Sequence, residues 1–153
     1  MWRKRDFARL RRCRPEDWLL LVEATLWLGL SRAAINVLPF RWTARLFALD
    51  PGETGAQPVK PPEDRIAWSL RAVAARAPWQ STCLVRALAG SGMLRFRGIP
   101  ATIALGVAKS EGAPASMIAH AWLSCGGVVI TGAAGHEQYR VIAKFSSGKT
   151  RTS

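Results

Sequence analysis

The stretch PWQSTCLVRALAGSGMLRFRGIPATIALGV, residues 78–107, predicts a helix followed directly by a strand. Ser81 or Thr82 can cap the helix, which places Cys83 in its first turn. Gly98, with a proline two positions later, is typical of a helix end, and the apolar ATIALGV after it reads as a strand. An alanine would fill this first turn equally well, so the thiol of Cys83 needs a chemical explanation.

The segments on either side of this stretch complete the pattern of an α+β fold. Residues 15–49 predict two helices that Pro39 separates, and residues 61–76 predict a third. Three further strands are expected: MIAHAWLSC at 117–125, VVIT at 128–131 and QYRVIAKF at 138–145. Because helices come first and strands follow without alternation, we expect N-terminal helices followed by an antiparallel sheet.

The chain is long enough for one domain with a core, or for one small domain plus an appendage. We divide it into a basic arm with the N-terminal helices at 1–49, a linker at 50–62, the core at 63–145 and a disordered tail at 146–153. The linker assignment depends on a run of proline, glycine and charged residues that has no apolar periodicity.

The net charge of +12 indicates an anionic partner, such as a nucleic acid, a membrane surface or an acidic peptide. The sequence has no zinc-finger spacing, RNP-type motif or phosphate-binding loop, so we expect no nucleic acid and attribute most of the charge to a generic surface and a basic N-terminal arm. In the apolar segment 18–40, only eight residues separate Glu23 from Arg32, too few for a membrane span, so we expect a buried or docking helix. Three cysteines without regular spacing favour a reducing, cytoplasmic location. Peripheral membrane association through segment 18–40 stays open.

Cys83 and His120 are the candidate nucleophile and general base. The unpaired N–H groups at a helix start favour a thiolate over a thiol, and a nearby imidazole can take the proton. His120 lies in MIAHAWLSC, where a strand would hold its ring firmly. An inert buried cysteine and a hydrogen-bonded core histidine are the alternatives that the residues themselves leave open.

An ordered set of short motifs resembles the C-terminal region of lasso-peptide biosynthesis B proteins, which are transglutaminase-like cysteine peptidases. The motifs are Cys83-Leu84, Ala87-Leu88, Arg97-Gly98-Ile99-Pro100, Gly106-Val107 and His120-Ala121-Trp122. The resemblance implies a transglutaminase- or papain-like core in which a nucleophile helix packs on the sheet, with Cys83 as nucleophile and His120 as base. The helical part, with LPFRW at 38–42, is similar to stand-alone forms of this peptidase, in which leader recognition belongs to a separate protein.

The family usually places an aspartate on the strand after the histidine, to orient the imidazole, and this chain has no aspartate after its histidine motif. If the Gly-Gly pair makes a two-residue turn, Trp122 faces Thr131 and Thr131 lies diagonal to His120. Glu137 is the only carboxylate in this region, and it reaches the ring only if its loop folds back. Thr131 and Glu137 are therefore alternative third members, and a backbone carbonyl or a water stays open too.

Trp79, Gln80 and Trp122 are candidate residues of a substrate groove, and the backbone N–H of Cys83 is the candidate oxyanion donor. Because side chains alternate between the two faces of a strand, Cys125 is expected to point away from the face that carries His120. We therefore expect neither a metal site nor a cofactor.

The resemblance implies a cysteine peptidase that removes the leader peptide from a lasso-peptide precursor. It also implies two partners, a separate leader-recognition protein and an asparagine-synthetase-like macrolactam cyclase. Two alternatives stay open. A transglutaminase-like acyltransferase would use the same nucleophile and base, and a catalytically degenerate leader-binding or scaffold protein would explain the missing aspartate.

Overall fold

The computed structural model describes residues 14–52, 62–77, 82–112, 114 and 116–147. The described helices are α2 (Pro15–Val37), α3 (Phe40–Leu46), α4 (Pro62–Ala74), α5 (Cys83–Phe96) and the 3-10 helix η1 (His136–Gln138). The described strands are β1 (Leu49–Pro51), β2 (Ala101–Lys109), β3 (Met117–Cys125), β4 (Val128–Thr131) and β5 (Arg140–Ser147). The class is mixed α+β, as the order of helices and strands predicts.

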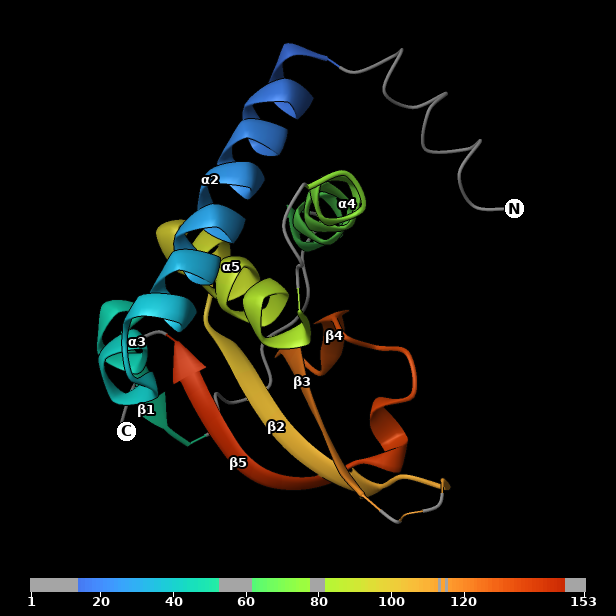
Figure 1. Cartoon of the computed structure of the whole chain (residues 1–153). Coiled ribbons are helices and arrows are strands. Elements are labelled where there is room, and N and C mark those ends of the chain that lie inside the picture. The colour runs from blue at the N-terminus through green and yellow to red at the C-terminus, as the bar shows by residue number, and fades with distance from the viewer. Residues whose placement is uncertain (1–13, 53–61, 78–81, 113, 115, 148–153) are drawn as a thin grey trace.

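Helix α5 lies between a helical layer and the sheet (Figure 1). Helices α2 and α4 pack against one side of α5, and strands β2 and β3 pack against the other. The sheet is antiparallel throughout and has the order β1-β5-β2-β3-β4, so β1 and β4 are its edges. The helix that begins with Cys83 and the strand that carries His120 are therefore direct neighbours.

Helix α5 is buried on all sides along residues 87–94. A Cβ at Gly92 would lie 2.5 Å from ring carbons of Trp27 in α2. On the opposite side, a Cβ at Gly90 would lie 2.6 Å from Cδ2 of Leu123 in β3. Real Cβ atoms do not approach other atoms so closely, so the two glycines let α2 and the sheet pack on α5 from both sides.

Both ends of α5 are closed by local hydrogen bonds. Oγ1 of Thr82, the N-cap, accepts a bond from a first-turn N–H at 3.4 Å. At the other end Gly98 has a positive φ of +70°, and its N–H donates to the carbonyl of Arg95 at 2.9 Å. The N–H of Ile99 donates to the carbonyl of Leu94 at 3.0 Å, which completes a Schellman motif. The Arg-Gly-Ile-Pro motif therefore ends the helix and starts β2.

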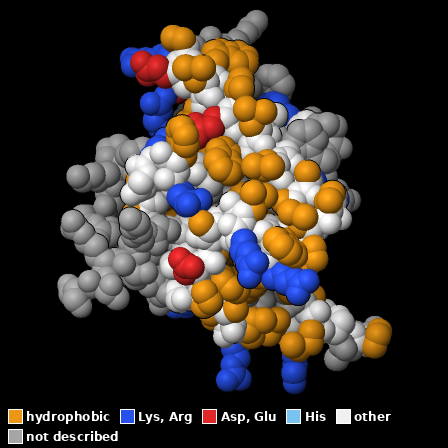
Figure 2. Space-filling model, turned by 90° about the vertical axis from the view of Figure 1, so that its left-hand side faces the viewer, with side chains coloured by type: hydrophobic (Ala, Val, Ile, Leu, Met, Phe, Trp, Pro, Cys, Tyr) orange, Lys and Arg blue, Asp and Glu red, His pale blue; other side chains and the backbone are white. Residues whose placement is uncertain are grey.

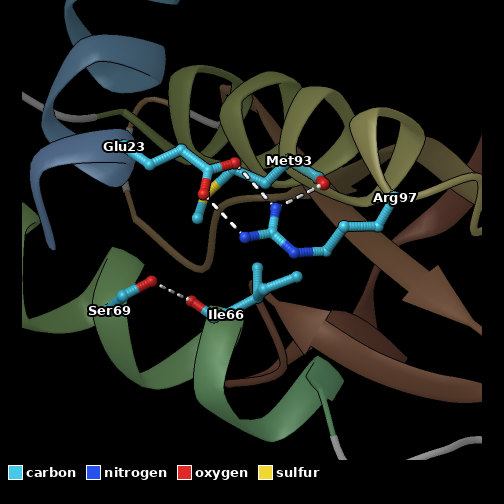
Figure 3. A network of polar contacts seen from close by, with 5 residues as sticks. All are labelled: Glu23, Ile66, Ser69, Met93 and Arg97. Atoms are coloured by element: carbon cyan, nitrogen blue, oxygen red, sulfur yellow. Dashed lines mark hydrogen bonds and ion pairs between the residues drawn. The ribbon is translucent and has the colours of Figure 1, made fainter. Parts of the chain in front are cut away.

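The arginine of that motif also ties α5 to α2 (Figure 3). The Arg97 guanidinium donates two hydrogen bonds to the Glu23 carboxylate, at 2.7 and 2.6 Å, and one to the carbonyl of Met93 at 3.0 Å. The bonds to Glu23 raise the pKa of Arg97, while burial acts in the opposite direction. Below this pair in Figure 3, the buried Ser69 hydroxyl of α4 donates to the carbonyl of Ile66 at 2.8 Å.

At the β1 edge the sheet extends further than the sequence predicts. We expect a helix through residue 49 and a linker from residue 50, but β1 forms there and pairs with the end of β5. Ser146 and Ser147, expected in a disordered tail, are buried residues of β5. Their hydroxyls donate at 3.5 Å to the carbonyls of Asp50 and Ala101, so these polar side chains are paired inside the sheet. The remaining parts of the predicted linker and tail outside the described residues are 53–61 and 148–153.

We expect Gly92→Ala to destabilise the protein and Gly29→Ala in α2 to stabilise it. Both glycines are helical, so each alanine gains about 1 kcal/mol of helix propensity. A Cβ at Gly29 meets no atom within 4 Å, whereas at Gly92 it meets the rigid ring of Trp27. Overpacking of this kind costs about 1–3 kcal/mol, so it should outweigh the propensity gain.

The measurement is the free energy of unfolding of both variants from urea denaturation. A stabilising Gly92→Ala, or a loss of stability at Gly29→Ala as large as at Gly92→Ala, would contradict this account of how α5 is packed.

Candidate active site

Cys83 is the first residue of α5 and directly follows the N-cap Thr82, as predicted. Its side chain is half-buried, and its thiol makes no hydrogen bond to any described residue. Cys125 is buried, and its thiol donates to the carbonyl of Pro100 at 3.4 Å. Cys13 lies outside the described residues. Of the two described cysteines, Cys83 is therefore the more accessible one, and it lies beside the free N–H groups of a helix start.

The ring of His120, on β3, is held by the backbone that follows β4. Its Nε2 lies 2.8 Å from the carbonyl oxygen of Gly132. Because a carbonyl oxygen can only accept, Nε2 must carry the proton in this contact. Nδ1 of the neutral ring then has the free lone pair, so the contact selects the tautomer in which Nδ1 can take a proton from a thiol.

Aromatic rings surround His120. The centroid of Tyr139 lies 5.0 Å from that of the imidazole and the centroid of Trp122 lies 6.0 Å from it. Trp122 also contacts His136, with a centroid distance of 5.6 Å. Gly106 of β2 makes room for these rings, since a Cβ there would lie 2.8 Å from Cβ of Tyr139 and 2.9 Å from ring carbons of Trp122. The glycine of the Gly-Val motif therefore has a packing role beside the imidazole.

Thr131 does not lie where the hairpin argument places it. The β3–β4 pairing starts at the turn as predicted, but its register shifts at a bulge next to Leu123, and Thr131 pairs with Leu123 rather than with Trp122. This one-residue shift turns Thr131 to the other face of the sheet. Its Cγ2 lies 3.8 Å from the Cβ position of Gly90, so the side chain faces α5 and not His120.

Neither predicted third member makes a hydrogen bond or an ion pair to the imidazole in the described part of the chain. Oγ1 of Thr131 is buried and has no hydrogen-bond partner among the described residues. Glu137 lies exposed on η1, and within the described part of the chain it makes no hydrogen bond or ion pair to His120. The structure therefore assigns the orienting contact to the backbone carbonyl of Gly132, the alternative that the sequence leaves open.

Cys83 and His120 lie on elements that pack together, but no hydrogen bond joins the thiol to the ring in the described structure. Helix α5 covers the face of β3 that carries Leu123, whereas His120 belongs to the alternate set of side chains, with Trp122. Strand β4 ends opposite Leu123, so His120 lies on a part of β3 that β4 does not pair with. The Cys–His pair therefore stays a prediction.

Of the three predicted groove residues, the structure describes only Trp122. Trp79 and Gln80 lie outside the described residues. Trp122 is only 7 % exposed, so its ring packs inside the protein and is not open to a substrate. Within the described ranges no group of three His, Cys, Asp or Glu side chains could hold a metal ion. None of the predicted catalytic residues lines the groove of about 380 Å³ between α2 and α4.

Tyr139 and the carbonyl of Gly132 are parts of the His120 environment that the sequence does not predict. Tyr139 is the single tyrosine of the chain and comes directly before a strand, which is only a weak sequence indication that it lies near His120. The carbonyl of Gly132 gives no signal at all, because every residue has one.

The family model of the transglutaminase-like superfamily matches residues 22–144 of the chain. The match begins inside α2 and ends inside β5, so it includes the N-terminal helices as well as α5 and the sheet. No curated protein and no solved structure matches the chain.

We expect Gly132→Ala to break the contact that holds His120, with Gly135→Ala as the matched control. Both glycines have a positive φ, +76° and +71°, so an alanine at either costs about 1 kcal/mol of strain. At Gly132 the Cβ would also lie 2.6 Å from the backbone oxygen of Ala121, whereas at Gly135 its nearest neighbour, on Gln138, is 3.6 Å away. Only the first substitution should displace the loop carbonyl.

The measurement is the Nε2–H signal of His120 in proton NMR spectra, because a hydrogen bond slows exchange of this proton with water. The signal should be visible in the wild type and in Gly135→Ala and lost in Gly132→Ala. Its survival in Gly132→Ala, or an equal loss in both variants, would show that Gly132 does not hold the ring.

Proposed function

The chain belongs to the transglutaminase-like superfamily, and from this membership, together with the motifs around Cys83 and His120, we propose that it is a cysteine peptidase that removes the leader from a lasso-peptide precursor. The superfamily consists largely of cysteine hydrolases and transferases. The observation that carries the proposal is the position of Cys83, half-exposed in the capped first turn of a helix. A helix start favours the thiolate, which is the reactive form of a cysteine nucleophile.

In the proposed reaction, His120 takes the thiol proton of Cys83 at Nδ1, and the sulfur attacks the carbonyl carbon of the scissile peptide bond. The oxyanion is stabilised by the backbone N–H of Cys83. The C–N bond then breaks, and the imidazolium gives its proton to the leaving amine. A water molecule, deprotonated by His120, attacks the resulting thioester, and the C–S bond breaks with return of the proton to sulfur.

This reaction requires the thiol of Cys83 and Nδ1 of His120 to come within hydrogen-bond distance. Because His120 belongs to the set of β3 side chains that α5 does not cover, this contact needs a movement of β3 or of the start of α5 when the substrate binds, and not only the shortening of an existing hydrogen bond. The hydrogen bond from Nε2–H to Gly132 supports the required tautomer, because it leaves Nδ1 free. A neutral carbonyl stabilises an imidazolium less than a carboxylate would, so we expect a slower enzyme than one with a complete triad.

The lasso precursor is proposed as the substrate from the ordered motifs around Cys83 and His120. We further propose that a separate leader-recognition protein delivers this precursor and that an asparagine-synthetase-like cyclase acts on the released core peptide. A short peptide held only at its cleavage site binds weakly, so binding energy from a remote leader contact is needed. An adjacent gene set with these members would support the assignment.

Hydrolysis and acyl transfer share the same acyl-enzyme, so the mass of the product separates the two reactions. Free leader and core peptides indicate a peptidase. A leader joined to an amine indicates a transferase, the alternative that the superfamily also supports.

We expect Cys83→Ala to abolish leader removal and to leave the fold intact, because a half-buried sulfur contributes little to stability. The measurement is mass spectrometry of a precursor peptide incubated with the chain and its leader-recognition protein, next to a circular dichroism melt of each variant. Cleavage by Cys83→Ala at the wild-type rate would overturn the proposal.

Thr131→Val and Glu137→Gln are matched controls for this experiment. Each removes a polar group that makes no hydrogen bond to His120, so each variant should keep at least about half of the wild-type rate. Thr131→Val should also gain about 1 kcal/mol of stability, because it removes a buried hydroxyl without a partner. A rate loss of about four orders of magnitude in Glu137→Gln would instead make that carboxylate the orienting group.

A further inference from the structure

Helix α2 is apolar on two opposite sides. One side is buried against α5 and α4 and includes Leu20, Ala24 and Leu28. The other side exposes large apolar side chains at a spacing of four residues. They are Trp18, Val22, Leu26 and Leu30. A helix with apolar side chains on all sides is normally buried on all sides. The exposed apolar side of α2 is therefore expected to bind another molecule.

The exposed apolar surface continues from α2 onto α3. Figure 2 shows hydrophobic side chains running down this side of the molecule, with arginine or lysine side chains between them. We name this surface the α2–α3 face and define it by its six large apolar side chains. They are Trp18, Val22, Leu26, Leu30, Trp42 and Leu46. Each of these side chains is 45–68 % exposed, and six of them on two neighbouring helices exceed the scattered single apolar residues that are normal on a soluble protein.

The charged side chains of α2 and α3 favour a negatively charged binding partner. Arg32, Arg41 and Arg45 form no ion pair within the described part of the chain, and Arg45 lies over the Trp42 ring at 5.4 Å. The acidic residues of α2 are already engaged. Glu23 is paired with Arg97, and Asp17 and Glu16 are paired with Arg65 of α4. Cations beside exposed tryptophan and leucine are typical of helices that bind a lipid surface.

Helix α2 is also long and apolar enough to cross a membrane by length and composition, and 33 % of its most apolar window is buried in the protein. The buried side is part of the core with α5, and Glu23 holds α2 to the end of that helix. A spanning position would pull Leu28 and Ala24 out of the core. The helix is therefore placed to lie along a membrane surface rather than to cross it.

We propose that the α2–α3 face binds the surface of a lipid bilayer that contains anionic lipid, with α2 parallel to the membrane plane. The apolar side chains enter the headgroup boundary, and Arg32, Arg41 and Arg45 contact lipid phosphates. The proposal does not depend on the reaction at Cys83, because the face is formed by other elements. The net charge of +12 adds long-range attraction to the same surface.

The test is sedimentation of the full chain with vesicles of phosphatidylcholine, with and without about 30 % phosphatidylglycerol. The wild-type chain should partition at least about tenfold more strongly onto the anionic vesicles. Leu26→Asp should lower that partition by about tenfold or more, because it places a charge at the centre of the face. Ile142→Asp on β5 is the matched control, since Ile142 is 64 % exposed and Leu26 is 68 % exposed.

A double variant, Arg41→Gln with Arg45→Gln, separates the electrostatic contribution and should weaken anionic binding by about five-fold per arginine. The proposal is overturned if the wild type does not bind anionic vesicles, or if Ile142→Asp weakens binding as much as Leu26→Asp. It is also overturned if light scattering shows a dimer that Leu26→Asp dissociates while vesicle binding is absent, because a second copy of the chain would then cover the face.

Discussion

The close approach of α2 and the sheet to opposite sides of α5 is the constraint on which the fold depends. The ring of Trp27 occupies the space beside Gly92, and Leu123 occupies the space beside Gly90. A side chain at Gly92 would meet the rigid ring of Trp27 and push α2 away from α5, whereas a side chain at Gly90 would displace the end of the Leu123 side chain between α5 and the sheet that Figure 1 shows. Helix α5 is held between α2 and the sheet by these contacts. Core packing, and not a surface loop, therefore fixes the position of its first residue, Cys83.

Much of the fold follows from local signals in the sequence. Capping by Thr82 and the positive φ of Gly98 set the limits of α5, and the period-two pattern of MIAHAWLSC sets β3. The errors fall where tertiary pairing outweighs local preference. Strand β1 and the last two serines of β5 have no sequence pattern that is typical of a strand. They become strands because the backbone groups of each segment form hydrogen bonds with those of the other.

The environment of His120 could be predicted only in part. Its place on a strand and the neighbouring Trp122 follow from the motif, but a bulge beside Leu123 turned Thr131 to the wrong face for the predicted role. The contact that replaces it is a backbone carbonyl, for which no residue type is diagnostic. The missing aspartate is therefore a real departure from the pattern of the resembled peptidases, and among the described residues the His120 ring is held by the carbonyl of Gly132 and by no carboxylate.

The central claim is that Cys83 is the nucleophile of a leader peptidase. The most direct measurement is the intact mass of the full chain, quenched with acid during turnover of a precursor peptide, followed by peptide mapping. The account predicts an added mass equal to the leader minus one water, located on Cys83 and released by hydroxylamine as a thioester would be. Leader release without any adduct on Cys83, or an adduct on Cys13 or Cys125 instead, would contradict it.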